Sequence, residues 1–174
     1  MAAVPNALSL ARLALAVAFP FLAPAWRLPV VLIGGFTDWL DGFVARRYHA
    51  QSAVGSLLDG VADKAFVLAV LVPLALEGTI AWWQVAWILL RDMVVAVVAL
   101  YLALRGEWRM FTQIPARMPG KVTTALLFLW IVAVLVPLPA SVTTPLFVLL
   151  AASSLTAAVD YGVQFGRALR ADGT

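Results

Sequence analysis

Four aspartates stand in two apolar stretches of the sequence and are its strongest candidates for chemistry. Asp38 and Asp41 lie three residues apart, and Asp59 and Asp63 lie four residues apart. An ionised carboxylate is costly to bury in apolar surroundings unless a cation, a metal ion or water stabilises it. The two pairs therefore predict a functional site rather than ordinary core packing.

Helical geometry places each pair on one face of its own helix. At 100° per residue, Asp38 and Asp41 are about 60° apart, and Asp59 and Asp63 are about 40° apart. The two helices are predicted to be antiparallel neighbours, because only a short loop joins them. The four carboxylates are thus expected to face one another.

The predicted helix ends also bring the two pairs to a common depth. Asp38 lies nine residues before the expected helix end at Arg47, and Asp63 lies nine residues after the expected start at Val54. At a rise of 1.5 Å per residue, both positions lie about 13 Å from the helix ends that border the loop.

Close carboxylates of this kind need a compensating charge, because like charges raise one another's pKa. One or two divalent cations would supply it, and would also orient phosphate oxygens and stabilise charge on an attacked phosphorus. The sequence has no cysteine and a single histidine, His49, which leaves carboxylate oxygen as the metal ligand. Oxygen ligands favour hard cations such as Mg²⁺, Mn²⁺ or Ca²⁺ over zinc or copper.

Small residues accompany the aspartates and would let a ligand or a neighbouring backbone approach closely. They are Gly42, Ala45, Gly55 and Gly60. Ordinary small-residue packing between helices is the alternative, and it is the favoured one for Gly60. Arg46 suits a pyrophosphate, although a positive charge that snorkels to the membrane surface would explain it equally well.

The composition indicates a membrane protein. The 174 residues are 64% apolar and 12% charged, and the mean hydropathy is +0.98, whereas a soluble domain has a charged fraction of about 25%. We expect one integral membrane domain over residues 1–174, with the first apolar stretch retained as a spanning helix. The expected surroundings are a lipid bilayer, and no nucleic-acid partner is expected.

Apolar stretches of about 20 residues between breakers predict an all-α fold of six transmembrane helices. The connections expected on one side of the membrane are Pro24–Arg27, Glu77–Thr79 and Pro137–Pro139. The predicted helices are Pro5–Ala23, Leu28–Arg47, Val54–Leu76, Trp82–Leu104, Pro119–Val136 and Pro145–Leu169.

The basic residues predict the orientation of these helices. Of the twelve, Arg27 alone falls on the side of those three connections. Eight fall on the other side, which the positive-inside rule places in the cytoplasm. The intramembrane carboxylate site is therefore expected to open to the cytoplasm. The eight are Arg46, Arg47, Arg105, Arg109, Arg117, Lys121, Arg167 and Arg170.

These residues complete a known pattern, D-x2-D-G-x2-A-R-x8-G-x3-D-x3-D, which runs from Asp38 to Asp63. In this pattern the chain resembles the CDP-alcohol phosphatidyltransferases. The resemblance covers most of the chain, because Pro5–Arg12 is similar to the family's P-N-x-[LIV]-[ST]-x-x-R opening and Gly120–Thr124 to its G-K-x-x-T segment.

The resemblance implies a six-helix membrane enzyme, usually a homodimer, that uses CDP-diacylglycerol as phosphatidyl donor with Mg²⁺ or Mn²⁺ and releases CMP. It implies that Asp38, Asp41 and Asp59 bind the metal. Asp63 would bind metal or act as the base that deprotonates the acceptor alcohol, and the sequence does not separate these roles. The residues that would line the cytidine diphosphate pocket are Gly42, Ala45, Arg46 and Gly55.

The acceptor is less well specified than the donor. Arg91, Arg117 and Lys121 supply positive charge that suits an acceptor carrying phosphate. Positive-inside topology is the alternative for the latter two, and Arg91 is expected to pair with Asp92 or with a site carboxylate. An acceptor used elsewhere in the family, inositol phosphate or serine, stays an alternative.

Two branches of the family resemble the chain most. Those are the branches that make phosphatidylglycerol phosphate and cardiolipin. Glycerol phosphate synthases often show Arg-Glu where this chain has Arg91-Asp92, and Thr156–Tyr161 resembles the cardiolipin synthases. The choice between glycerol 3-phosphate and phosphatidylglycerol as acceptor stays open.

Two other classes of protein also place carboxylates in membrane helices. An intramembrane prenyltransferase holds a diphosphate with two aspartate-rich helices, but usually spreads its motifs over distant spans. A cation transporter binds its ion at midplane carboxylates. No inverted repeat is visible in the sequence, and a cation path does not need the Gly-x-x-Ala-Arg context of Gly42–Arg46.

Overall fold

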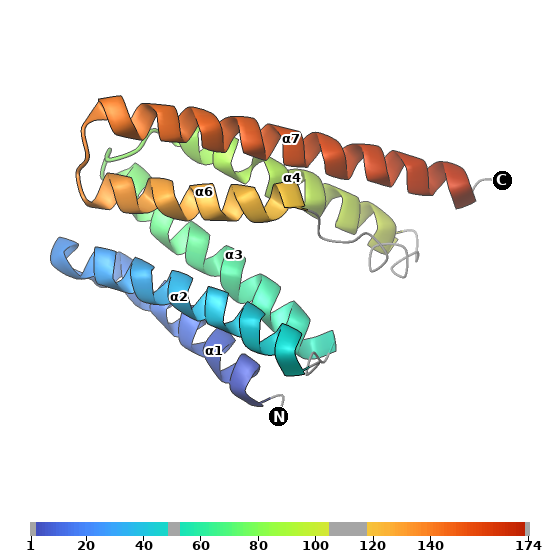
Figure 1. Ribbon diagram of the computed structural model, residues 1–174, viewed down its shortest axis with the longest axis horizontal. Coiled ribbons are helices and arrows are strands. Elements are labelled where there is room, and N and C mark those ends of the chain that lie inside the picture. Colours follow the sequence, from blue (N-terminus) through green and yellow to red (C-terminus); the bar gives the residue numbers. More distant parts are fainter. Residues whose placement is uncertain (1–2, 49–52, 105–117, 173–174) are drawn as a thin grey trace. The chain divides into compact units, whose positions relative to one another are not determined.

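The computed structural model describes the backbone of residues 3–48, 53–104 and 118–172 (Figure 1). Side chains are described over a smaller part, which leaves out those at 3–6, 38–48, 53–59, 99, 102–103, 118–119 and 167–172. The described part is helical throughout its regular structure, which confirms the all-α prediction. Its helices are α1 (Ala3–Ala18), the short 3₁₀ helix η1 (Phe19–Phe21), α2 (Pro24–Tyr48), α3 (Ala53–Leu76), α4 (Trp82–Leu104), α6 (Met118–Leu135) and α7 (Ala140–Asp172).

The first compact unit, residues 1–81, is a bundle of α1, α2 and α3. Helix α1 packs mainly against α3 and also contacts α2, while η1 continues the α1 contact with α3. Apolar side chains fill the space between these helices, and their van der Waals packing stabilises a bundle in which lipid is as apolar as the side chains themselves. The buried side chains include Ala16, Phe19, Val31, Ala62, Phe66, Val70, Leu71 and Leu74.

The second compact unit, residues 82–174, is built on α7. Helix α7 packs against both α4 and α6. Aromatic side chains join these helices, since the Phe147 ring centroid lies 5.2 Å from that of Trp83 and 5.5 Å from that of Trp130. Edge-on and tilted aromatic pairs at these distances add to the stabilisation from burial alone.

Two helices begin four or five residues earlier than the sequence predicts. Helix α2 begins at Pro24 rather than Leu28, so the predicted connection Pro24–Arg27 is wrong and forms the first helical turn instead. Helix α7 begins at Ala140 rather than Pro145. Pro24 is tolerated at the start of α2 because the first turn of a helix has unpaired N–H groups in any case. Pro145 is the sixth residue of α7 and lies inside the helix.

One described helix is long and apolar enough by itself to cross a membrane, the stretch Ala140–Gly166 of α7. Two shorter apolar stretches, Ala7–Phe21 and Gly120–Leu135, accompany it. Helices α2 and α3 carry the charged residues of the predicted site within their length, which lowers their apolarity.

An ion pair joins the start of α2 to the end of α3. Arg27 donates from Nη1 to Glu77 Oε2 at 2.5 Å and from Nη2 to Glu77 Oε1 at 2.6 Å. The Arg27 guanidinium also lies 5.9 Å from the Phe19 ring centroid. The pKa of Glu77 is lowered from its ordinary value of 4.5, chiefly by the hydrogen bonds from Arg27 and also by the Arg27 charge, against the opposing effect of burial.

We expect the substitution Glu77→Gln to lower the melting temperature of the purified protein by about 2 °C at neutral pH. Half of the carboxylate is exposed, so its ion pair is worth about 1 kcal/mol or less. Because folding lowers the pKa of Glu77, its stabilisation is present above pH 4.5 and is lost as pH falls through the folded value. Thermal denaturation of both proteins between pH 3 and 7 checks this, and equal melting temperatures at pH 7 would contradict it.

Candidate active site

A glycine lets α2 and α3 touch next to the predicted carboxylate site. The ring of Phe66 on α3 is 3% exposed, and it lies end-on against the backbone of Gly34 on α2. A Cβ atom at Gly34 would lie 2.4 Å from Cζ of Phe66 and 2.7 Å from Cε1. No side chain fits at this position without moving the ring, so the contact sets how closely the two helices approach.

The Gly34–Phe66 contact lies on the helix faces that carry the aspartates. The α2 aspartates follow Gly34 by four and seven residues, and the α3 aspartates precede Phe66 by three and seven residues. Positions with these spacings share one helical face. On both helices the farther aspartate lies about 10 Å along the axis from the contact. These distances support the prediction that the two pairs of aspartates lie at a similar level along the axes of α2 and α3.

Of the four predicted site aspartates, Asp63 is the one whose side chain lies in the part of the chain that the structure describes. Its carboxylate is 37% exposed, and its Oδ1 lies 3.5 Å from Nη1 of Arg12. Arg12 comes from α1, where it is the single charged residue of Ala3–Ala18. The third helix of the unit therefore brings a cation to the aspartate-bearing face of α3.

Arg12 is a residue that the sequence-based site does not include. In the sequence it matches the family's opening segment, but nothing there says which carboxylate it meets. The signal that could have found it is the cost of a lone arginine inside an apolar helix, which implies a partner of opposite charge. The structure supplies that partner from a position 51 residues farther along the chain.

The described side chains alone do not form a metal centre. Among them no three carboxylates, histidines or cysteines come together. The side chains of Asp38, Asp41 and Asp59 lie outside the described residues, although their backbone lies in α2 and α3. A donor set of carboxylate oxygens, as the sequence predicts for this site, is of the type that Mg²⁺ or Mn²⁺ prefers.

The predicted nucleotide pocket continues the same two helical faces toward the loop. Ala45 follows Asp41 by four residues, and Gly55 precedes Asp59 by four residues. Their helical positions come from α2 and α3, and their side chains lie outside the described residues. The same is true of Gly42 and Arg46.

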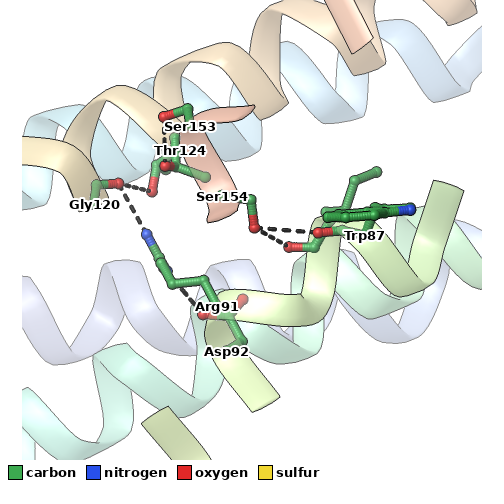
Figure 2. Close-up of polar contacts among 9 residues, drawn as sticks. Trp87, Arg91, Asp92, Gly120, Thr124, Ser153 and Ser154 are labelled. Atoms are coloured by element: carbon green, nitrogen blue, oxygen red, sulfur yellow. Dashed lines mark hydrogen bonds and ion pairs between the residues drawn. The ribbon is translucent and has the colours of Figure 1, made fainter. Parts of the chain in front are cut away.

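A polar cluster around Arg91 lies in the second unit (Figure 2). Arg91 donates from Nη1 to the Gly120 carbonyl at 2.9 Å, and from Nη2 and Nε to Asp92 Oδ1 at 3.0 and 3.3 Å. The expected pairing of Arg91 with Asp92 is therefore confirmed. A Cβ atom at Gly120 would lie 3.3 Å from Nη1, so glycine there leaves room for the guanidinium.

Two further hydrogen bonds between helices lie near this cluster. Thr123 on α6 and Ser153 on α7 share a hydrogen bond of 2.8 Å. The hydroxyl of Ser154 on α7 donates to the Trp87 carbonyl on α4 at 3.1 Å (Figure 2). Together with the Arg91 bond from α4 to α6, these contacts tie each helix of the unit to the other two.

Of the other two predicted acceptor residues, the structure describes one. Lys121 follows Gly120 on α6 and its side chain is exposed. Arg117 lies outside the described residues. Arg91 and Lys121 are therefore neighbours in the second unit, because the Arg91 guanidinium donates a hydrogen bond to the carbonyl of Gly120, the residue before Lys121.

Comparison with known proteins gives relatives with related names. The Mycobacterium tuberculosis (strain ATCC 25618 / H37Rv) protein named "Putative cardiolipin synthase" is 34% identical over 126 residues, which are 70% of this chain and 58% of that protein. A second protein of that strain, named "Probable phosphatidylglycerophosphate synthase", is 33% identical over 135 residues, 77% of this chain and 61% of that protein.

A third relative comes from another organism. The "CDP-diacylglycerol--glycerol-3-phosphate 3-phosphatidyltransferase" of Salmonella choleraesuis (strain SC-B67) is 32% identical over 117 residues, 60% of this chain and 62% of that protein. The chain spans about six-tenths of the length of these curated relatives. The family model described as CDP-alcohol phosphatidyltransferase matches residues 2–159, which include α1 to α6 and most of α7. By this match, and with its aspartate pattern complete on α2 and α3, the chain belongs to the CDP-alcohol phosphatidyltransferase family.

Proposed function

We propose that the chain transfers a phosphatidyl group from CDP-diacylglycerol to an alcohol and releases CMP. The observation that supports this proposal is the close contact of Gly34 with Phe66, because it joins α2 and α3, the two helices whose sequences carry the aspartate pattern of this family. The family match favours this activity over a cation transporter or an intramembrane prenyltransferase. Because it spans both compact units, it also supports one functional domain over residues 1–174.

The reaction assigns a task to each part of the site. Asp63 takes the proton of the acceptor hydroxyl, and the alcohol oxygen then forms a bond to the phosphorus that carries diacylglycerol. The bond from that phosphorus to the CMP oxygen breaks, and CMP leaves with the electron pair. A bound Mg²⁺ or Mn²⁺ supplies countercharge for the diphosphate. The proposed metal ligands are Asp38, Asp41, Asp59 and Asp63, and the proposed nucleotide pocket is Gly42, Ala45, Arg46 and Gly55.

The surroundings proposed for this site are a bilayer that all six long helices cross, with the aspartates opening to the cytoplasm. The apolar stretch Ala140–Gly166 and the excess of basic residues on one side support this. The family resemblance also supports a homodimer.

The proposed acceptor is glycerol 3-phosphate or phosphatidylglycerol. The names of the three relatives support both, since they include a cardiolipin synthase and enzymes of phosphatidylglycerol phosphate synthesis. The acceptor phosphate is assigned to Arg91, Arg117 and Lys121. A guanidinium has five N–H groups, and the bonds to Asp92 and Gly120 use three of those on Arg91, which leaves two for a phosphate among the described contacts.

The test is CMP release by the purified full chain in detergent or lipid with Mg²⁺ or Mn²⁺. The donor is CDP-diacylglycerol, and the acceptors are glycerol 3-phosphate, phosphatidylglycerol, inositol phosphate and serine, each offered alone. We expect release with glycerol 3-phosphate or phosphatidylglycerol and loss of release when a chelator removes the metal. Folded protein that releases no CMP with any acceptor would overturn the proposal, and release with inositol phosphate or serine alone would replace its acceptor.

A further inference from the structure

We infer that Arg12 is a positioning residue for Asp63, holding its carboxylate in the direction that the transfer reaction needs. The inference rests on the proposed function, since it assigns Asp63 a task in it. The contact that carries it joins Arg12 Nη1 to Asp63 Oδ1 at 3.5 Å. Through this contact a third helix, α1, contributes a side chain to the proposed site, beside the two helices that carry the aspartates.

The burial of Arg12 fixes the direction of its side chain. Arg12 is 1% exposed and lies in a buried stripe with Ser9 and Ala16 of α1 and Phe19 of η1, which are 1%, 4% and 0% exposed. These positions are three or four residues apart and form the face that packs against α3. A long arginine side chain usually turns its charge to water. This one is enclosed on its helix face and reaches an aspartate instead.

The packing of α3 explains why Arg12 meets Asp63. Ala62 and Phe66 are 0% and 3% exposed and belong to the buried stripe of α3. Asp63 follows Ala62 directly, so it stands at the edge of that stripe and keeps 37% of its side chain exposed. The carboxylate therefore has one side toward the buried guanidinium and another toward the open face of the helix.

The chemistry of the pair suits positioning. Arginine stays protonated at all physiological pH values, so the charge beside Asp63 is permanent. A carboxylate has about four lone-pair sites, so a contact with Arg12 is compatible with the binding of a proton or a metal ion by the same carboxylate. An aspartate side chain held from one side loses rotational freedom, and small errors in the placement of a reacting group are expensive in rate.

The first experiment measures steady-state CMP release by the variants Arg12→Met and Arg12→Lys. We expect Arg12→Met to lower kcat about 10- to 100-fold, the range for a misplaced catalytic group, with the KM for CDP-diacylglycerol changed less than about 3-fold. Arg12→Lys keeps a positive charge and should recover part of kcat. It also keeps the test valid if Arg12→Met fails to fold.

Arg27→Met is the matched control, because Arg27 is also buried and paired to a carboxylate in the same unit. We expect it to lower the melting temperature but to keep kcat near that of the wild type. If Arg12→Met is folded and keeps its kcat, the inference is overturned. A raised KM with unchanged kcat also overturns it, because Arg12 would then bind substrate directly.

The second experiment needs no turnover. Melting temperatures of Arg12→Met, Asp63→Asn and the double variant give the coupling between the two residues. We expect the double variant to lose less than the sum of the single losses, because removing one partner leaves the other charge buried. Additive losses would show that the residues do not interact and would overturn the inference. This readout remains valid even if the wild type releases no CMP, so failure of the proposed function and failure of the positioning role are distinguishable.

Discussion

The variant Asp63→Asn is expected to lower CMP release by about 10²- to 10⁴-fold, the range for removal of a general base. Asparagine has nearly the shape of aspartate, but it cannot accept the proton of the acceptor alcohol and carries no charge for a metal ion. The variant should still fold, because the amide can occupy the half-exposed space of the carboxylate. Initial rates of CMP release with saturating metal and acceptor measure the effect.

Asp160→Asn is the matched control for this prediction. Asp160 lies on α7 and accepts a hydrogen bond of 2.7 Å from Gln164 of the same helix. It undergoes the same chemical change as Asp63, and we expect it to keep the rate within about 3-fold of the wild type, as for a residue outside the reacting groups. Residual activity above one tenth of the wild type in folded Asp63→Asn would remove Asp63 as the base.

Binding of the donor separates the two roles of Asp63. If Asp63 acts chiefly as base, stabilisation of the Asp63→Asn variant by added CDP-diacylglycerol and Mg²⁺ should stay close to that of the wild type. If it is also a required metal ligand, that stabilisation should fall together with the rate. Thermal shift measurements with and without metal distinguish these outcomes.

The sequence predicts local features of this chain well, because they depend on neighbours along the helix. Helix α3 was expected from Val54 to Leu76 and begins one residue earlier, at Ala53. The pairing of Arg91 with Asp92 joins adjacent residues and was also expected. Hydrophobic length and helical spacing are enough for both.

Contacts between distant residues could not be predicted in the same way. Arg27 and Glu77 are separated by 50 residues, and the sequence predicts each of them in a connection between helices. The bond from Arg91 to the Gly120 carbonyl spans 29 residues. Which turn of one helix meets which turn of another depends on packing of whole surfaces, and a single sequence does not contain that register.

In the candidate site, too, the local features could be predicted from the sequence and the contacts between distant residues could not. The aspartate spacing predicts the two faces and their depth, because both follow from helix geometry. It did not give Arg12, which comes from a third helix. It also did not give the role of Gly34, because a glycine in an apolar helix has meaning only once the aromatic ring that lies against it is known.

The substitution Gly34→Val is expected to have the second large effect, on both stability and rate. Its Cβ would lie 2.4 Å from Cζ of Phe66, far inside the separation of about 3.5–4.0 Å that carbon atoms prefer. Overpacking of this kind costs about 1–3 kcal/mol. Because the Phe66 ring is buried and has little room to turn aside, we expect α2 to move away from α3 and the two aspartate-bearing faces to separate. We expect kcat to fall about 100-fold, as for a misplacement of about 1 Å.

Gly162→Ala is the control for the general effect of adding a methyl group to a helix. A Cβ atom at Gly162 on α7 meets no atom within 4 Å, so this variant should match or slightly exceed the wild type in melting temperature. Melting temperature and CMP release are measured for both variants under the same conditions. Gly34→Val that keeps the wild-type rate and melting temperature would contradict a role for the contact in setting helix spacing.

A second change in Phe66 separates spacing from simple loss of stability. Phe66→Leu shortens the side chain and removes Cζ, the atom nearest to the added Cβ. In the Gly34→Val background it should restore part of the rate, because α2 can return toward its position, although it removes buried apolar area and so does not restore the full melting temperature. A rate that recovers while stability does not would tie activity to the distance between α2 and α3. A rate that follows stability in all variants would instead make the contact one of many that merely hold the bundle together.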